Sequence, residues 1–437
     1  MSGWPDLCEG MKIILAHRWI FLAGFFLGAF GSLFASDWPQ FLGPHGNGKV
    51  DEPLVNKDWT NRAPARVWSL EMQDNGYAAP CAAMGKVFVI DHMGDDDVVR
   101  ALDLKSGKEV WRFAYAAKEK DSFGHALATP AFDEGRLYTL SREGLLHCLD
   151  ATCGTNIWSC NLMAKFEGQL AFYRMVTSPK VDGDRLIVCP GGKAGVVALN
   201  KRTGAMLWSS PNGEPMGHAT PVSATVAGAK VYLCFSGLNL LGLDAADGHI
   251  RWRFPWKTVE AMNTANPVIV SSNEVLITCL DNGTALLRIE GDNRVTQVWK
   301  NSKIRSYYGT PLLHRGLVFA KDDSKDLVCF DVATGQERWR QPNFGTKWCD
   351  AGGILLDGVI VIANGRTGDL FLVAAQGEGY RQLGWIPSPA GQETLPAPIL
   401  ADGHLILRSK KRLVALNMAG ASGHSESAIL TSPAIRP

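Results

Sequence analysis

The stretch "ALDLKSGKEVWRF" at residues 101–113 decides the fold, because close variants of it return along the chain. An apolar strand ends at Asp103, a Ser-Gly turn follows, and a second strand opens at Val110 and Trp111. The variants are "HCLDATCGTNIWSC" (147–160), "VALNKRTGAMLWSS" (197–210), "LGLDAADGHIRWRF" (241–254) and "CFDVATGQERWRQ" (329–341). A repeat with so long a period indicates a repeat architecture.

The Trp of this phrase recurs at intervals of 40 to 50 residues and marks eight units. The eight positions are Trp68, Trp111, Trp158, Trp208, Trp252, Trp299, Trp339 and Trp385. The residue eight positions before the Trp is Asp103, Asp150, Asn200, Asp244 or Asp331 in five units. In the unit that ends at Trp299, Glu290 stands nine positions before it. A Pro opens most units, for example Pro130 and Pro179.

Each unit contains four short strands. Residues 128–149 show "ATPAFD", "RLYTLS" and "LLHCLD" separated by Glu-Gly turns, and "IWSC" follows the next turn. Short strands at this spacing with Gly-rich turns indicate an all-β protein, and no stretch has sustained helical periodicity. Four-stranded antiparallel units of about 45 residues are typical of propeller blades. The sequence therefore predicts an all-β propeller.

The Asp, Gly and Trp that recur in the phrase have structural roles in such a blade. The Asp can cap the turn after the third strand, and the Gly supplies the positive φ that the turn needs. The Trp lies early in the outermost strand, where its ring can cover the gap between neighbouring blades and its N–H needs a partner.

The two ends of the repeat region predict how the ring closes. Residues 66–72 ("RVWSLEM") provide only an outermost strand, whereas the last unit ("APILADGHLILRSKKRLVALNM") has three strands and no Trp. We expect the first strand to complete the last blade, which removes exposed sheet edges. This gives eight blades. The unit at 348–385 lacks the Asp and the Pro, so seven blades is the alternative.

Composition limits the partners and the compartment. Apolar residues make up 46% and charged residues 20%, and Lys plus Arg (44) balance Asp plus Glu (43), so nucleic acid is not expected as a partner. An apolar run at 19–30 follows Lys12, His17 and Arg18, and Ala35 and Ser36 offer a cleavage site. We therefore expect export to the periplasm or cell envelope, with an uncleaved membrane anchor as the alternative.

These patterns divide the chain into four parts. We expect a signal peptide at 1–35 (with Met11 as an alternative start), an N-terminal extension at 36–58, the propeller at 59–418 and a flexible tail at 419–437. Once the signal is cleaved, the protein would be at most peripheral to a membrane. Cys148, Cys234, Cys279 and Cys329 lie inside apolar strands, where cysteine acts as a small hydrophobic residue, so no disulfide framework is expected. Cys153 and Cys160 flank one hairpin but would not face each other across it.

The repeat resembles the pyrroloquinoline quinone (PQQ) repeat family of eight-bladed propellers. Its pattern Ala-Leu-Asp-x-x-Thr-Gly-x-x-x-Trp is similar to "ALDLKSGKEVW", "LDATCGTNIW" and "FDVATGQERW", and the resemblance covers roughly residues 59–418. The segment "DWPQFLGPHGNG" at 37–48 looks like the opening of exported members from planctomycete-type bacteria. The size and the export signal are closer to the non-enzymatic, BamB-like members, although no lipid-acceptor Cys closely follows the apolar run.

The resemblance also names an enzymatic alternative, a PQQ-dependent oxidoreductase of alcohols or sugars. Such an enzyme needs a Ca²⁺ site of Glu, Asn and Asp oxygens and a carboxylate base. In the family a Trp and a vicinal disulfide clamp the cofactor, and this chain has no adjacent Cys pair. It also lacks Cys-x-x-Cys-His, Gly-x-Ser-x-Gly and His-Glu-x-x-His. We expect no catalytic residue, metal or cofactor, and PQQ with Ca²⁺ only under the alternative.

Propeller topology points to one candidate site. The loops that precede the innermost strands converge at one mouth of the channel, and concave sites with convergent polar groups are candidate binding sites. Their residues are Asn75, Tyr77, His125, Tyr173, Arg174, His218, Asn263, Asn266, Arg305, Tyr307, Tyr308, Trp348, Asp350, Gln392 and Glu393.

The alternative for these residues is that they line a wet channel and satisfy backbone groups. His125 and His218 with Asp350 are a weaker candidate for a metal group. The sequence as a whole predicts an exported, non-catalytic binding or scaffold propeller of the bacterial cell envelope, whose partner is a protein or a small polar ligand. A carbohydrate or peptide binder that uses the channel mouth is a further alternative.

Overall fold

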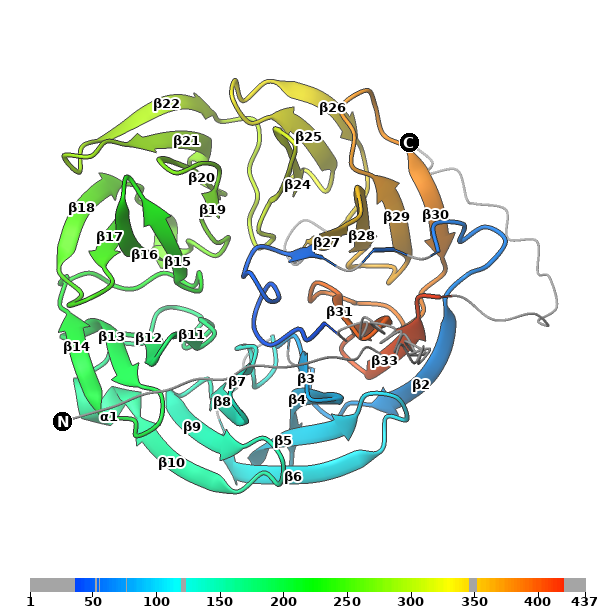
Figure 1. The fold of residues 1–437 in the computed structure, drawn as a ribbon, viewed down its shortest axis with the longest axis horizontal. Helices are drawn as coiled ribbons and strands as arrows, with labels where there is room; N and C mark the ends of the chain where they lie inside the picture. Colours follow the sequence, from blue (N-terminus) through cyan, green and yellow to red (C-terminus); the bar gives the residue numbers. More distant parts are fainter. Residues whose placement is uncertain are drawn as a thin grey trace, which may run out of the picture. The chain divides into compact units, whose positions relative to one another are not determined.

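Strands carry nearly all the regular structure of the computed structural model, which describes residues 36–51, 53–54, 56–75, 77–118, 123–345 and 352–419. The strands form eight antiparallel sheets of four strands, one of which gains a fifth, short strand. The sheets are arranged as blades around a central channel (Figure 1). This confirms the eight-bladed propeller and shows that the seven-blade alternative is wrong, because the irregular unit at 348–385 forms a complete blade.

The first four blades are built from consecutive strands. Blade 1 contains β3 (Cys81–Ala83), β4 (Lys86–Met93), β5 (Asp96–Asp103) and β6 (Glu109–Ala116). Blade 2 contains β7 (Ala131–Asp133), β8 (Arg136–Leu140), β9 (Leu145–Asp150) and β10 (Asn156–Asn161). Blade 3 contains β11 (Lys180–Asp182), β12 (Arg185–Gly191), β13 (Gly195–Asn200) and β14 (Met206–Ser210). Blade 4 contains β15 (Val222–Val226), β16 (Ala229–Phe235), β17 (Asn239–Asp244) and β18 (Ile250–Pro255).

Blades 5 to 7 follow the same plan. Blade 5 contains β19 (Val268–Ile269), β20 (Glu274–Cys279), β21 (Gly283–Ile289) and β22 (Val295–Asn301). Blade 6 contains β23 (Leu312–His314), β24 (Leu317–Lys321), β25 (Leu327–Asp331) and β26 (Glu337–Gln341). Blade 7 contains β27 (Gly353–Leu356), β28 (Val359–Ala363), β29 (Leu370–Ala374) and β30 (Gln382–Ile386).

Blade 8 closes the ring with the two ends of the repeat region. It contains β31 (Ile399–Ala401), β32 (His404–Arg408) and β33 (Arg412–Asn417), and its outermost strand is β2 (Ala65–Glu71). Strand β2 pairs with β33 in the antiparallel sense, with Trp68 opposite Ala415. The predicted completion of the last blade by the first strand is therefore confirmed.

In the part of the chain that the structure describes, helices are rare and short. One α-helix, α1 (Leu162–Phe166), begins after β10, where the Asn161 side chain accepts the backbone N–H of Ala164. A 3₁₀ turn, η1 (Val259–Ala261), follows β18. Within the described ranges, no helix has the length and apolar character needed to cross a membrane.

The core lies between the blades, because both faces of each middle strand are buried. Strand β28, for example, is buried at all five positions, and β16 at its last five. Cys148, Cys234, Cys279 and Cys329 are buried in these strands as free thiols. Cys153 and Cys160 are also free, and Cys8 and Cys349 lie outside the described residues.

The Trp side chains of the repeat link neighbouring blades. The Trp111 indole lies against Gly154 of blade 2, and its Nε1–H donates to the Ala151 carbonyl at 3.1 Å. The same bond runs from Trp68 to Leu104, from Trp158 to Lys201, from Trp299 to Val332 and from Trp339 to Gln376. Trp208 and Trp252 depart from this pattern: the Trp208 ring lies on Gly248 without such a bond, and Trp252 lies against Gly242 of its own blade.

The repeat acids cap the turns that receive these rings. The Asp150 carboxylate accepts the N–H groups of Thr152 and Cys153, and Asp331 accepts those of Ala333 and Thr334. Asp103 and Asp244 make the corresponding bonds to Ser106 and Ala246. Hydrogen bonds that favour the charged form lower the pKa of all four carboxyl groups; for Asp103 the largest cause is Ser106.

Candidate functional site at the channel mouth

A series of hydrogen bonds around the channel holds the loops that enter the innermost strands. The Thr129 backbone N–H donates to the Ser178 hydroxyl at 2.9 Å, and the Ser178 N–H donates to the Thr220 hydroxyl at 3.0 Å. The Thr220 backbone N–H donates to the Asn266 side-chain oxygen, and the Asn266 backbone N–H donates to the Thr310 hydroxyl. Each of these residues precedes a Pro, which favours an extended backbone before the inner strand. These bonds therefore link blades 2 to 6, each to the next, beside the channel.

Residues 36–50 enter the channel from the face opposite this mouth. The Ser36 carbonyl accepts the N–H of Asp402, in the turn after β31, and Trp38 forms an isolated antiparallel bridge with Ala82 of β3. The chain then turns back, and β1 (Lys49–Val50) runs parallel to β27. Figure 1 shows this dark blue segment across the middle of the ring. Its residues Trp38, Phe41 and Leu42 border the cavity in the channel, and Trp38 is only 2% exposed.

This segment converts the channel into a cup that is open at the mouth. The cavity has a volume of about 160 Å³, and Trp38, Phe41 and Leu42 form part of its lining. Thr129, Ser178 and Thr220 of the hydrogen-bonded series also line it. Asp, Glu, Lys and Arg are absent from the described residues that line the cup. The cup is therefore an uncharged, mainly apolar site.

Aromatic side chains follow the rim of the cup from one entering loop to the next. The ring centroids lie 5.7 Å apart for Tyr77 and Phe123, and 5.1 Å apart for Phe123 and Tyr173. Tyr173 lies 5.5 Å from His218, and on the far side Tyr308 lies 4.1 Å from Tyr307. Burial and the neighbouring phenols of Tyr307 and Tyr173 raise the pKa of Tyr308, so its hydroxyl stays neutral.

His218 is the most deeply buried polar ring of the lining. It is 4% exposed, and among the described residues neither ring nitrogen has a hydrogen-bond partner. Its backbone N–H donates to the Asn263 carbonyl at 2.8 Å, which fixes its loop. Burial lowers the pKa of His218 to about 4, so the imidazole is neutral at pH 7.

The structure thus brings Tyr77, Tyr173, His218 and Tyr308 of the expected residues to one cavity. Asn263 is fully buried and donates to the Ser236 carbonyl, so it holds the loop rather than facing the cup. Glu393 pairs with Lys410, whose ammonium lies 5.9 Å from the Tyr77 ring centroid. Arg174 is absent from the lining and has a left-handed backbone.

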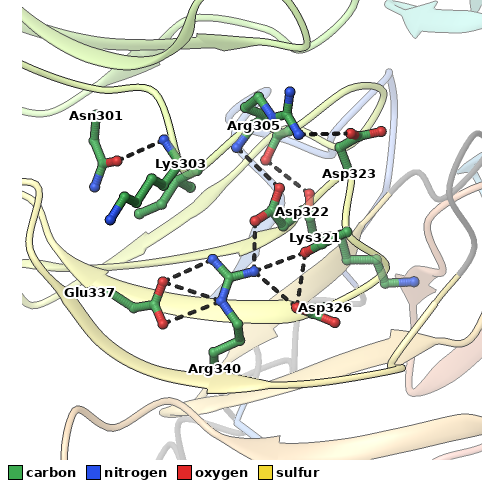
Figure 2. Close-up of polar contacts among 12 residues, drawn as sticks. Asn301, Lys303, Arg305, Lys321, Asp322, Asp323, Asp326, Glu337 and Arg340 are labelled. Carbon is green, nitrogen blue, oxygen red and sulfur yellow. Dashed lines mark hydrogen bonds and ion pairs between the residues drawn. The ribbon is translucent and has the colours of Figure 1, made fainter.

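Arg305 belongs to a separate charged cluster on blade 6 (Figure 2). Its guanidinium lies 3.3 Å from the Asp323 carboxylate, and its backbone N–H donates to Asp322. Figure 2 shows Arg340 in the middle of this cluster, with Glu337 on one side and Asp322 and Asp326 on the other. Burial alone would lower the pKa of Arg340, but these hydrogen bonds outweigh it and raise that pKa. Two guanidinium groups thus pair with four carboxylates, and the acids of this cluster outnumber the bases that they contact.

His125 lies in a different cluster from His218. Its ring stacks on His92 with centroids 3.3 Å apart, and the His92 ring nitrogens face Asp97 and the Gly94 carbonyl. Burial, opposed by the His92 hydrogen bond, raises the pKa of Asp97 to about 6. Ligand atoms of His92, Asp97 and His125 lie within 4.8 Å of one another, a set that could hold a metal such as Zn²⁺. Asp244, Asp247 and His249 form a second such group at an exposed turn.

Trp348 and Asp350 lie outside the described residues, so the weaker candidate metal group of His125, His218 and Asp350 is not tested as a whole. Sequence reasoning missed the floor of the cup, because residues 36–48 carry no repeat signal. It also missed the polar side chains of the inter-blade bonds, although a Thr, Ser or Asn directly before the Pro in five units was a usable signal.

The cup does not suit PQQ, whose ring carries three carboxylates that need cationic partners. The described lining supplies no Lys or Arg for them and no carboxylate for Ca²⁺. Trp38, Phe41 and Leu42 occupy the lower channel instead.

Comparisons with known proteins agree with the fold. The family model described as "Outer membrane protein assembly factor BamB" matches residues 95–341, more than half of the chain. The outer membrane protein assembly factor BamB of Yersinia pestis is 25% identical over 315 residues, which is 69% of this chain and 76% of that protein.

Two solved structures show the same architecture. BamB from Moraxella catarrhalis has a TM-score of 0.59 at 14% identity and covers 82% of this chain and 99% of its own. Quinohemoprotein alcohol dehydrogenase from Comamonas testosteroni has a TM-score of 0.67 at 12% identity and covers 90% of this chain and 82% of its own. At such identities the likeness concerns the fold alone.

Proposed function

The chain belongs to the BamB-like family of PQQ-repeat propellers, and from this premise we propose that it is a non-catalytic binding protein or scaffold of the bacterial cell envelope. Its partner in this proposal is a protein, and the mouth of the channel is the contact site. The name of the relatives, an assembly factor of outer membrane proteins, supports this class of role.

The uncharged cup with its filled floor is the observation that carries the proposal. A quinone dehydrogenase needs charged groups around its cofactor and a base beside its substrate. In the described lining, the polar groups are hydroxyls and the neutral His218 imidazole. Two charged pairs lie near the rim, Glu393 with Lys410 and Arg305 with Asp323. A cup of this kind suits apolar contact with a partner.

The test has an enzymatic arm and a partner arm. The purified chain is incubated with PQQ and Ca²⁺, desalted, and assayed for quinone absorbance and for dye reduction with alcohols and sugars. We expect neither retained quinone nor turnover, and retention with turnover would overturn the proposal.

In the partner arm, a photo-cross-linking amino acid replaces Phe172 at the rim or Ile157 on the outer wall, in a bacterium that produces the chain. Both side chains are exposed, at 60% and 44%. We expect a discrete envelope-protein adduct from position 172 and none from 157, after fractionation places the chain in the envelope. Equal adducts at both positions, or a cytoplasmic chain, would contradict the proposal.

A further inference from the structure

We propose that the cup is an anchor pocket for one neutral aromatic side chain of a polypeptide partner, with tyrosine preferred because His218 can bond to its hydroxyl. This inference rests on the proposed function, because it names the chemistry that a protein partner presents to the cup. An anchor residue in a pocket commonly dominates a protein interface.

The volume of the cup suits a single ring. At about 160 Å³ it is close to the apolar cavity of about 150 Å³ that takes up benzene in another protein. Its lining includes Trp38, Leu42, Val176 and Pro398, and the described lining residues are uncharged. A charged side chain would lose its hydration there without gaining a partner. The occupant is therefore a neutral, largely apolar group.

The rim favours an aromatic group over an aliphatic one. Tyr77, Phe123 and Tyr173 follow one another around it at centroid distances typical of edge-to-face contacts. An incoming ring can extend this series, since aromatic pairs contribute binding free energy beyond that of the area they bury.

His218 supplies the polar preference. Its two nitrogens are shielded from solvent and have no partner among the described residues, and a buried polar group without a partner is unfavourable. A neutral imidazole has one donor and one acceptor, and a phenolic hydroxyl can serve either. A phenylalanine side chain leaves both nitrogens unsatisfied.

The surface beside the cup indicates a polypeptide rather than a free small molecule. Phe172 is 60% exposed, and its ring lies 4.9 Å from that of Tyr173 in the lining. Leu238 and Val259 are also exposed, on two segments joined by the hydrogen bond from the Trp256 N–H to the Leu238 carbonyl. Residues that flank the anchor can cover this apolar surface.

Among the described residues near the N-terminus, Ser36 is held at Asp402, in the turn at the end of β31 that lies away from the cup. The occupant in this proposal is a side chain of another protein.

Titration calorimetry with the purified full chain tests the proposal. The probes are capped pentapeptides with leucine at both ends, glycine at positions 2 and 4, and tyrosine, phenylalanine or leucine at the centre. We expect the tyrosine peptide to bind about fivefold more tightly than the phenylalanine peptide, and the leucine peptide more weakly than both. Equal affinity for all three, or binding of glucose in place of the peptides, would overturn the inference.

Variants separate the contributions of the pocket. His218→Phe should abolish the preference for tyrosine while the phenylalanine peptide still binds. Val176→Trp fills the cup and should abolish binding of both aromatic peptides. Phe172→Ser should weaken binding about threefold, whereas Ile157→Ser on the outer wall should leave it unchanged. Unaltered peptide binding in both His218→Phe and Val176→Trp contradicts the proposal. If Val176→Trp does not fold, the expected threefold loss of affinity in Phe172→Ser still tests it.

The two proposals fail in different ways. If the peptides do not bind the unaltered chain, and the rim cross-link to an envelope protein persists in Val176→Trp, only the anchor pocket is wrong. If PQQ is retained with turnover, the scaffold function is wrong whatever the peptides do.

Discussion

Trp111 and Gly154 are in direct contact across the boundary between blades 1 and 2. A Cβ atom at Gly154 would lie 2.5 Å from the indole, and the backbone there has φ +76°. The indole N–H also bonds to Ala151, three residues earlier. This contact recurs at Gly107, Gly204, Gly248 and Gly335, so it is a general joint of the ring.

We therefore expect Gly154→Ala to lower the free energy of unfolding far more than Gly183→Ala. Both glycines have positive φ, but a Cβ at Gly183 meets no atom within 4 Å. The control should cost about 1 kcal/mol for backbone strain, and Gly154→Ala about 1–3 kcal/mol more for overpacking. Urea unfolding measures the difference. Equal losses would show that the Trp does not hold the joint.

Ser178→Ala should weaken the inter-blade bonds at one point. The Thr129 N–H would lose its acceptor while remaining buried, at a cost of about 1–3 kcal/mol. Hydrogen exchange at the Thr129 amide should become faster, and Ser178→Thr, which keeps the hydroxyl, should restore its protection. Unchanged exchange at Thr129 in Ser178→Ala would count against a role for the bond.

His218 should make the protein less stable in mild acid. Its pKa is about 4 in the folded chain against 6.5 for a free histidine, so the unfolded chain binds the proton first as pH falls. The stability contributed by the neutral ring is fully present above pH 6.5 and is lost as pH falls toward 4. The slope is at most about 1.4 kcal/mol per pH unit.

Comparison with His218→Phe isolates this titration. The difference in unfolding free energy between the two chains should be constant above pH 6.5 and should shift in favour of the variant below it. His147, whose pKa burial also lowers to about 4, titrates in both chains and cancels. Parallel curves down to pH 4.5 would mean that His218 titrates normally.

Arg340→Ala should destabilise blade 6 by about 2–3 kcal/mol, because the acids around it would lose their common donor. The control is Arg338→Ala on the same strand. Arg338 pairs with Asp331 but is 52% exposed, and exposed pairs contribute at most about 1 kcal/mol. Thermal unfolding compares the two variants, and similar melting temperatures would contradict a stabilising role for the cluster.

The repeat made the fold predictable, because each unit repeats the same turn chemistry and the same Trp. Blade 7 lacks that Asp, yet it forms because β28 and β29 are apolar at nearly every position and pack between their neighbours. In blade 7, the burial of these apolar strands outweighs the loss of the hydrogen bonds that the Asp makes in other turns.

The site was predictable only in part. Topology placed Tyr77, His218 and Tyr308 on loops that meet at the mouth, but it could not give side-chain directions. Glu393 has φ +57° and pairs with Lys410, while Arg305 faces Asp323. The floor depends on Trp38, which bridges to Ala82 and shares a core cluster with residues as distant as Ile399, so no local pattern predicts it.

Because β2 pairs with β33, the last blade can form only after nearly the whole chain has been made. The strand that is made near the beginning has to wait, with its hydrogen-bonding groups unpaired, until the last strand of the ring has been made. The ring therefore stays open until β33 has been made, and a truncation that removes β33 leaves β2 and β32 as unpaired sheet edges that favour aggregation.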